Sequence, residues 1–419
     1  MYKSNKYTIL DHLLVQYHYT TILFNFGQFK FSLELFLGLS YTLFGNISNF
    51  FIFRRRIKSM QIIGLIAEYN PLHNGHLYQI NKIKELYPDS LIVLCLGSYF
   101  TERGDIGILS KEDKVKISLE YGIDLIVELP TIYTVQSADI FAYQSVKILN
   151  FLGIDTLVFG SESNDLSLLK ELADKQDDIK YQEKVKEYLD NGCNYPSALA
   201  KALEVNFEFK ANDLLGISYL KAINKINKNI KVQTIKRTND YLDTQSTDII
   251  VSASNIRKRF FNKEDVSKFT PCSQVLVKPD YDLYFKMLKL KIMTSRDLNS
   301  YLDVSEGIDN LLKKVIMESH SLEELVLKIK TKRYTYNRLN RMFLHIVLGI
   351  EKDYPDEVYL RILGFNKKGQ EYIKTKKIKE NYKNTDCYNL ELRGSCLYDM
   401  LTNENTYAFE IKNQPIIKN

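Results

Sequence analysis

The 419 residues are enough for two or three domains, and a composition of 45% apolar and 26% charged residues excludes a disordered chain. The 57 Lys and Arg residues exceed the 51 Asp and Glu residues by only 6, a net charge too small to indicate a nucleic-acid partner without a local basic surface. The five cysteines are odd in number and lack metal-ligand spacing, which argues against a disulfide framework and a zinc site. We therefore expect reduced thiols, a cytoplasmic location and no metal-ligating residues.

Residues 1–59 differ from the rest of the chain. They are rich in aromatic residues, and residues 31–53 carry Glu34 as their one charge before the run Arg54, Arg55, Arg56. This pattern allows a membrane anchor, but polar residues interrupt it and no helical periodicity is visible. We favour translation from Met60, with a genuine anchor and an ordered extension as the alternatives. The segment is therefore expected to lie outside the fold.

From residue 61 onward, short apolar runs alternate with amphipathic stretches. The runs predict strands at residues 62–67, 91–96, 125–129, 156–159 and 231–236. The stretches predict helices at residues 75–86, 110–121 and 137–152, with Ser110 and Ser137 as N-caps. Such alternation indicates right-handed βαβ units, so we expect an α/β domain with a Rossmann-like parallel sheet over residues 60–265.

Residues 266–419 have the pattern of successive helices. Their basic residues concentrate at residues 328–341 and 367–383. We expect a mainly α-helical C-terminal domain with a basic surface.

A strand, a sharp turn and a helix start meet at residues 62–76. In an open parallel sheet, ligands bind at the carboxyl ends of the strands, and the first turn of the next helix offers unpaired N–H groups to phosphate. Gly75 allows close backbone approach, and His73 and His76 can donate hydrogen bonds to phosphate oxygens as charge builds at phosphorus. The alternatives are a helix cap or half of a metal site. The strand context favours a nucleotide site with His73 and His76 as catalytic residues.

The run His73-Asn74-Gly75-His76 is similar to the HxGH signature of nucleotidyltransferases and class I aminoacyl-tRNA synthetases. Residues 60–369 as a whole resemble the bacterial tRNA(Met) cytidine acetate ligases. The resemblance rests on blocks in the same order, among them EYNPLHNGH, GIDLIVELP, NDLLGISYLKAI, SASNIR and TKRYTYNRLNR.

This resemblance implies a two-step reaction. Acetate would attack ATP to give acetyl-adenylate and pyrophosphate, and the wobble cytidine of elongator tRNA(Met) would then accept the acetyl group to form N4-acetylcytidine. Mg²⁺ is expected to accompany ATP, held mainly by phosphates. No protein partner is implied, and no membrane unless residues 1–59 are translated.

The resemblance also assigns an ATP site. The turn would bind ATP through Ile66, Ala67, Glu68, Tyr69, Asn70, Pro71, Leu72, His73, Asn74, Gly75, His76, Leu77, Tyr78 and Gln79. Further contacts would come from Gly160, Asn212, Arg237, Ser252, Ser254 and Arg257. Without the resemblance, Gly160 is equally a strand-end turn and Asn212 a helix N-cap. A capping box would have Glu or Gln where Arg257 stands, which favours a phosphate role for this helix start.

The loop that carries Arg103 and Lys111 can either contact the substrate or have a structural role. The sequence leaves both possibilities open, because this loop departs from the family pattern.

The basic helical region is the candidate for tRNA binding, and we expect it to lie apart from the ATP crevice. The cations that would contact tRNA are Lys332, Arg333, Arg338 and Arg341. Arg338 and Arg341 share a helix face, while Tyr334 and Tyr336 have rings that can stack on bases. A solvated helix face is the alternative.

Two other functions share parts of this pattern. A cofactor nucleotidylyltransferase that joins AMP to a small phosphorylated acceptor would use the same ATP site without the basic helices. A non-catalytic RNA-binding protein would keep the ATP-binding fold and use it as a switch. The intact His73, His76 and Arg257 argue against this second function.

Overall fold

The computed structural model describes residues 60–419 except residues 192, 194, 206, 208, 238–247, 306, 332, 333, 355, 357 and 358. Residues 60–419 form one compact unit. The expectations for residues 1–59, including the membrane anchor, lie outside the described residues. Within the described part of the chain, no helix combines the length and the apolar character that crossing a membrane requires.

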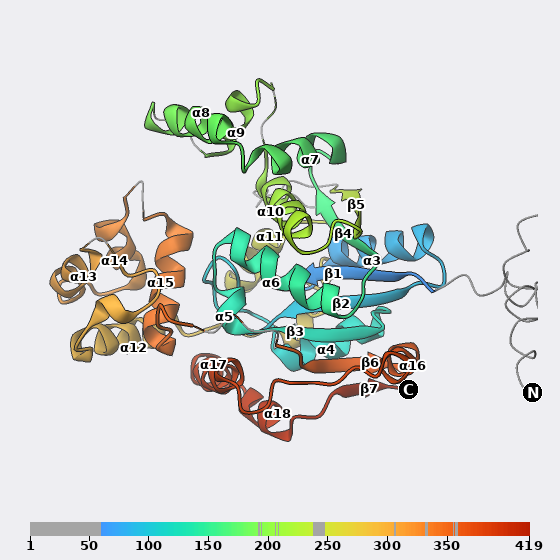
Figure 1. The fold of residues 1–419 in the computed structure, drawn as a ribbon. Coiled ribbons are helices and arrows are strands. Elements are labelled where there is room, and N and C mark those ends of the chain that lie inside the picture. The colour runs from blue at the N-terminus through green and yellow to red at the C-terminus, as the bar shows by residue number, and fades with distance from the viewer. Residues whose placement is uncertain are drawn as a thin grey trace, which may run out of the picture. The chain divides into compact units, whose positions relative to one another are not determined.

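A seven-stranded sheet lies at the centre of this unit, in the order β5-β4-β1-β2-β3-β6-β7 (Figure 1). The strands are β1 (Ile62–Ala67), β2 (Leu91–Gly97), β3 (Leu125–Leu129), β4 (Thr156–Ser161), β5 (Lys231–Lys236), β6 (Ile362–Asn366) and β7 (Ile416–Lys418). Strands β1 to β5 pair in parallel. Both β2 and β3 are buried along their whole length, as parallel strands covered on both faces should be. The predicted strands and the α/β fold class are confirmed.

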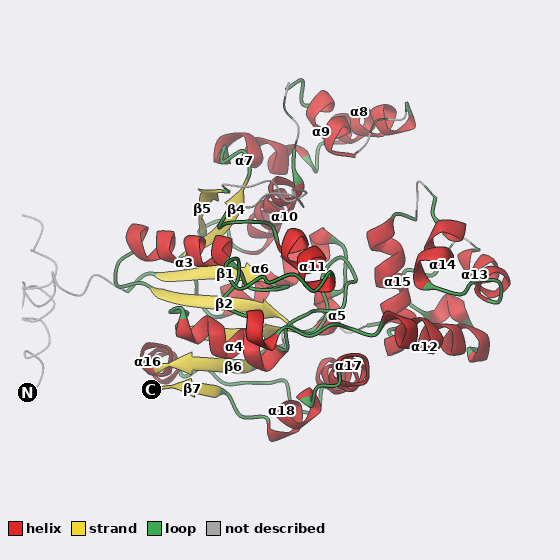
Figure 2. Cartoon of the chain, turned by 180° about the vertical axis from the view of Figure 1, so that it is seen from behind, coloured by secondary structure: helices red, strands yellow, loops and turns green. Residues whose placement is uncertain are grey.

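Helices cover both faces of the sheet (Figures 1 and 2). Alternate residues of a strand point to opposite faces. Ile92 and Leu94 pack in the hydrophobic cluster of α3 (Asn74–Leu86) and α4 (Lys111–Glu120), whereas Val93 and Cys95 pack in the cluster of α6 (Ala138–Phe151). The remaining helices of this half are α5 (Thr131–Thr134), α7 (Leu166–Lys175), α8 (Ile179–Asp190), α9 (Tyr195–Ala202), α10 (Ala211–Ile226) and α11 (Ala253–Phe261).

The region after residue 265 is helical, but it also completes the sheet. Its helices are α12 (Tyr281–Thr294), α13 (Ile308–Ile316), α14 (Leu322–Ile329), α15 (Tyr336–Leu348), α16 (Lys367–Lys376), α17 (Asp386–Thr402) and α18 (Thr406–Lys412). Strand β6 pairs antiparallel with β3, and β7 pairs in parallel with β6, so two strands were missed from the sequence. The division into a catalytic domain and a tRNA-binding domain at residue 265 stays a functional hypothesis.

Two predictions about helix starts need correction. Helix α10 begins at Ala211 with Lys210 as its N-cap, so Asn212 lies inside the first turn and is not a cap. The N-cap of α11 is Ser252, whose side chain accepts a hydrogen bond from the N–H of Asn255. The capping-box position is therefore residue 255, and the argument from Arg257 was wrong.

Candidate active site

A cavity of about 440 Å³ opens at the carboxyl ends of the central strands. Its walls include residues that follow β1, residues 101–105 after β2, Gly160 near the end of β4, and Arg237 directly after β5. The chain runs from β1 to β2 and β3 on one side and places β4 and β5 on the other side. The cavity therefore lies where the strand order reverses, which is the usual ligand site of such sheets.

His73 and His76 form a reciprocal cap at the start of α3. The Nδ1 atom of His73 accepts the N–H of Gly75 at 3.0 Å, and the Nδ1 atom of His76 accepts the N–H of His73 at 3.2 Å. The two rings pack with their centroids 3.8 Å apart. Because both Nδ1 atoms act as acceptors, each neutral imidazole carries its proton on Nε2. Both side chains line the cavity, so they offer N–H donors to an anion there.

The surroundings keep both imidazoles neutral at pH 7. Burial, followed by the charges of Arg237 and Arg257, lowers the pKa of His73 to about 3. Burial, followed by His73 and Arg237, holds the pKa of His76 well below its usual value. The helix-cap alternative is correct, because each Nδ1 atom accepts a backbone N–H, and this cap fixes the orientation of both rings.

Arg257 joins the first turn of α11 to the turn after β1. Its Nη1 atom donates to the backbone oxygen of Asn70 at 2.7 Å, and its Nη2 atom donates to Ser254 Oγ at 3.3 Å. Nη2 also lies 3.9 Å from a carboxylate oxygen of Asp105. Arg257 lines the cavity, whereas Ser252 caps the helix and Ser254 supports Arg257 without lining the cavity.

Glu162 organises the opposite wall, and it was missed from the sequence. Its Oε1 atom accepts the side-chain amide of Asn212 at 2.6 Å and lies 3.8 Å from Nε of Arg237, while Oε2 accepts the N–H of Asp213 at 3.0 Å. Glu162 thereby holds the start of α10 next to Arg237. Its position directly after β4, at the carboxyl edge of the sheet, was the available signal.

The structure brings together most of the residues predicted to bind ATP. Those that line the main cavity are Ile66, Ala67, Glu68, Tyr69, Asn70, His73, His76, Gln79, Gly160, Asn212, Arg237 and Arg257. Gly75 and Tyr78 line a smaller cavity of about 40 Å³, which also borders His73 and His76. Pro71, Leu72, Asn74 and Leu77 line neither cavity. Leu72 is fully buried, and the side chain of Asn74 donates to the backbone oxygens of Ile249 and Lys268.

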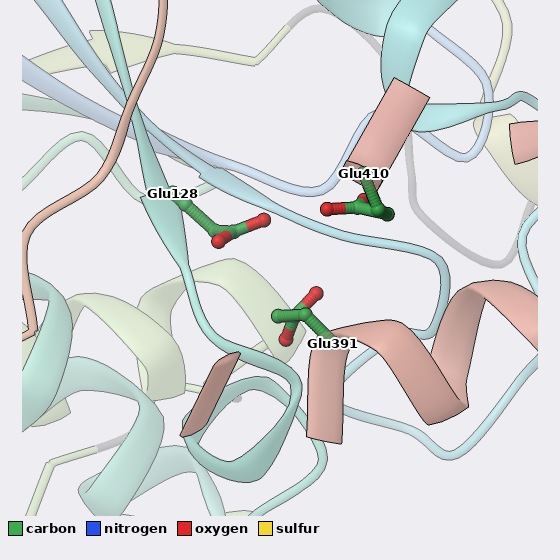
Figure 3. A group of neighbouring side chains, drawn as sticks. All are labelled: Glu128, Glu391 and Glu410. Atoms are coloured by element: carbon green, nitrogen blue, oxygen red, sulfur yellow. The ribbon is translucent and has the colours of Figure 1, made fainter. Parts of the chain in front are cut away.

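Arg103 and Lys111, for which the sequence left substrate contact and a structural role open, have different surroundings. Arg103 lines the cavity. Lys111 is fully buried and bonds to the carboxylates of Glu128, Glu391 and Glu410, which Figure 3 shows pointing toward one another. Oxygens of these three groups lie within 4.8 Å of one another, an arrangement suited to a cation, and the ammonium group of Lys111 supplies the positive charge. Lys111 is therefore structural.

Helix α15 lies against the cavity wall, so the expectation that it is separate from the crevice was wrong. A Cβ atom added at Gly104 would lie 2.4 Å from the backbone nitrogen of Arg341, so the loop after β2 packs closely on this helix. Arg341 Nη1 donates to the backbone oxygen of Glu102 at 3.1 Å and pairs with its carboxylate at 3.3 Å. Asn337, in the first turn of α15, lines the cavity.

The residues predicted to bind tRNA have different surroundings. Lys332 and Arg333 lie outside the described residues. Arg338 lies over the ring of Tyr334 at 4.3 Å from its centroid. Tyr334 is only 5% exposed and donates through its hydroxyl group to the backbone oxygen of Ser305, so it cannot stack on a base as expected. Tyr336 is 47% exposed.

The comparisons with known proteins show the family of this chain. The family model of the HIGH nucleotidyl transferases matches residues 60–413. The tRNA(Met) cytidine acetate ligase of Caldicellulosiruptor bescii is 37% identical to this chain over 77% of its length and 86% of the relative. The chain belongs to this ligase family. The Mycoplasma mobile ligase is also 37% identical, over 69% of this chain and 99% of the relative.

Solved structures of related proteins share the fold. The crystal structure of Thermotoga maritima TmcAL bound with alpha-thio ATP aligns with a TM-score of 0.72 and 26% identity, over 85% of this chain and 99% of that chain. The apo form of the same protein aligns with a TM-score of 0.73. As a member of the ligase family, the chain uses ATP.

Proposed function

We propose that the protein activates acetate with ATP to form acetyl-adenylate, and then acetylates the wobble cytidine of elongator tRNA(Met) to N4-acetylcytidine. The observation that carries this proposal is the pair of neutral imidazoles with Nε2–H donors in one cavity with Arg237 and Arg257. Its substrates follow from the 37% identity to tRNA(Met) cytidine acetate ligases. The activity belongs in the cytoplasm, where tRNA is found.

The first step needs positive charge and hydrogen-bond donors around the α-phosphate. The acetate oxygen attacks phosphorus, and the bond to the pyrophosphate oxygen breaks. Negative charge builds on the phosphate oxygens, where His73 and His76 donate hydrogen bonds and Arg237 and Arg257 supply permanent cations. Donors fixed in a water-poor site are worth about 3 kcal/mol each in the transition state.

The second step uses the mixed anhydride that the first step creates. The amine of cytidine attacks the acetyl carbonyl, and AMP leaves with the electron pair of the broken carbon–oxygen bond. This route needs no covalent enzyme intermediate. The presence of Asn337 in the cavity wall supports an acceptor that reaches the cavity along α15.

Mg²⁺ is expected to accompany ATP. Two carboxylates of the cavity wall are already paired, Glu102 with Arg341 and Asp105 with Arg257. Among the described residues, Glu68 is the further carboxylate of this wall, so the protein offers a few ligands at most and the ion is expected to be bound mainly by phosphate oxygens.

The test is a complete reaction with ATP, labelled acetate and bulk tRNA, followed by digestion of the RNA to nucleosides. We expect the label in N4-acetylcytidine, with none when ATP is omitted and with labelling roughly 10²–10³-fold slower when His73→Ala replaces the wild type. Transfer of AMP to a phosphorylated pantetheine or nicotinamide precursor, with no label in RNA, would favour a cofactor nucleotidylyltransferase instead.

A further inference from the structure

The cavity wall has two sides, one formed after β4 and β5 and the other after β2. Gly160, Asn212 and Arg237 lie at or after β4 and β5, on one side of β1. Residues 101–105 follow β2 on the other side of β1, and Asn337 comes from α15. Strands β1 and β2 run toward the part of the molecule where α15 lies (Figure 2). An acceptor delivered along α15 therefore enters on the β2 side.

Glu68 lies on the border between the two sides. It directly follows β1, lines the cavity, and accepts the N–H of Glu102 through Oε1 at 2.5 Å. Among the described residues, no cation lies within ion-pair distance of Glu68, whereas Glu102 and Asp105 are paired with arginines at 3.3 and 3.9 Å. An unpaired carboxylate repels the phosphates of an anionic nucleotide, so the position of Glu68 in this site needs a chemical explanation.

We propose that Glu68 accepts the proton of the cytidine amine as this amine attacks the acetyl carbonyl. This role rests on the function proposed above. A carbon–nitrogen bond forms, the carbon–oxygen bond to the phosphate of AMP breaks, and the proton moves from nitrogen to a carboxylate oxygen of Glu68. The exocyclic amine of cytosine is a weak nucleophile because its lone pair is delocalised, so removal of its proton assists the attack.

The groups around Glu68 suit this task. Burial, followed by the carboxylate of Glu102, raises the pKa of Glu68 to about 7, although the N–H of Glu102, Lys114 of α4 and Arg103 lower it. Tyr219 of α10 lines the same cavity, and burial, followed by the charge of Glu68, raises the pKa of its phenol. A base whose pKa lies near the working pH is both available and strong enough to take the proton. Partial protonation also limits repulsion between Glu68 and ATP.

The experiment separates the two steps on the full chain. Wild type and Glu68→Gln are incubated with ATP and acetate, pyrophosphate release is measured, and tRNA is then added for single-turnover acetyl transfer between pH 5.5 and 9. We expect Glu68→Gln to transfer acetyl roughly 10²–10⁴-fold more slowly than wild type, a loss well beyond any change in its pyrophosphate release. The wild-type transfer rate should fall below about pH 7, and the variant should lose this acidic limb.

Two further variants test whether Glu68 itself is the base. Glu102→Gln removes a like charge, so the acidic limb should persist but move to lower pH. Glu68→Ala should regain transfer when imidazole is added as a small external base, which a merely structural role would not produce.

Three results would overturn the proposal. One is transfer by Glu68→Gln at the wild-type rate with the wild-type pH profile, and another is a fall in pyrophosphate release as large as the fall in acetyl transfer in that variant. The third is absence of imidazole rescue in Glu68→Ala. A wild-type protein that forms no acetyl-adenylate would instead overturn the proposed function, and this role with it.

Discussion

Two lysines that lie one turn apart on α4 have opposite surroundings, although both are fully buried. The ammonium group of Lys111 bonds to three carboxylates, and their attraction outweighs burial and raises the pKa of Lys111. Among the described residues, the ammonium group of Lys114 bonds only to the backbone oxygens of Ser98, at 2.5 Å, and Gly97, at 3.4 Å. Burial there lowers the pKa to about 7, even though Glu68 raises it in part.

The carboxylates near these lysines differ in the same way. For Glu128, burial is outweighed by Lys111 and Arg361, and the pKa falls to about 2. For Glu68, the effect of burial exceeds that of the nearby cations, and the pKa rises to about 7. Compensated charges hold β3, α17 and α18 together, whereas burial without a close ion pair moves the pKa of Glu68 and that of Lys114 to about 7.

The largest expected effect tests this contrast through stability. Lys111→Met would leave three buried carboxylates, of which Glu128 and Glu410 still pair with Arg361, so the free energy of unfolding should fall by about 3–5 kcal/mol. Lys114→Met is the matched control and should cost much less, because it leaves no buried carboxylate unpaired in that cluster. Urea unfolding of both variants measures the difference. Equal losses would show that the two sites are not distinct in the way we describe.

The next effect concerns acetate activation. His73→Ala or His76→Ala should reduce acetate-dependent pyrophosphate release roughly 10²–10³-fold and leave tRNA affinity nearly unchanged, because each removes one donor to the reacting phosphate. Since the pKa of His73 is about 3, the wild-type activation rate should show no histidine titration between pH 5.5 and 7. Wild-type turnover in either variant would remove the imidazoles from the reaction.

A third prediction sharpens the comparison through the pH dependence of stability. The pKa of Glu68 is raised in the folded state from 4.5 to about 7, so the folded protein keeps a proton that the unfolded chain loses, and Glu68 reduces stability as the pH rises through this window. The free energy of unfolding of Glu68→Gln, relative to that of wild type, should therefore rise by about 1–2 kcal/mol between pH 5 and pH 8. This rise is smaller than the whole pKa shift would give, because the group borders a cavity. Urea unfolding at both pH values measures the gain. A constant difference would place the pKa of Glu68 outside this window.

The smallest effect concerns tRNA. The double change Arg338→Ala and Arg341→Ala should weaken tRNA binding about tenfold at physiological salt and lower the salt slope by about one per lost phosphate contact. Arg338→Ala alone is the cleaner probe, because Arg341 also bonds to Glu102 at the cavity wall. Pyrophosphate release without tRNA should survive in Arg338→Ala. Unchanged affinity and salt slope in the double variant would exclude this helix face from the RNA site.

Local patterns predicted the central strands and the HxGH turn because each is encoded within a few residues. A buried parallel strand needs a continuous apolar run, as at β2, and Ser110 accepts the N–H of Asp113 as its position before α4 predicts. The same reasoning located the cavity, since strand ends and helix starts meet there.

Long-range contacts decide the features that were missed. Strand β7 has three residues, and its partner β6 pairs in turn with β3, which lies far away along the chain. Tyr334 is buried, and its hydroxyl group donates to the backbone oxygen of Ser305, 29 residues away along the chain. The same holds for Lys111, whose three carboxylate partners come from β3, α17 and α18.

The most direct test measures the protonation of Glu68 itself. Infrared spectra of protein with isotope-labelled glutamate carboxyl groups, recorded from pH 5 to pH 9 for wild type and Glu68→Gln, isolate the carboxyl band of this residue by difference. We predict a protonated carboxyl band that disappears with a midpoint near pH 7 in wild type and is missing from the variant. A Glu68 carboxyl group already ionised at pH 5.5 would contradict the account.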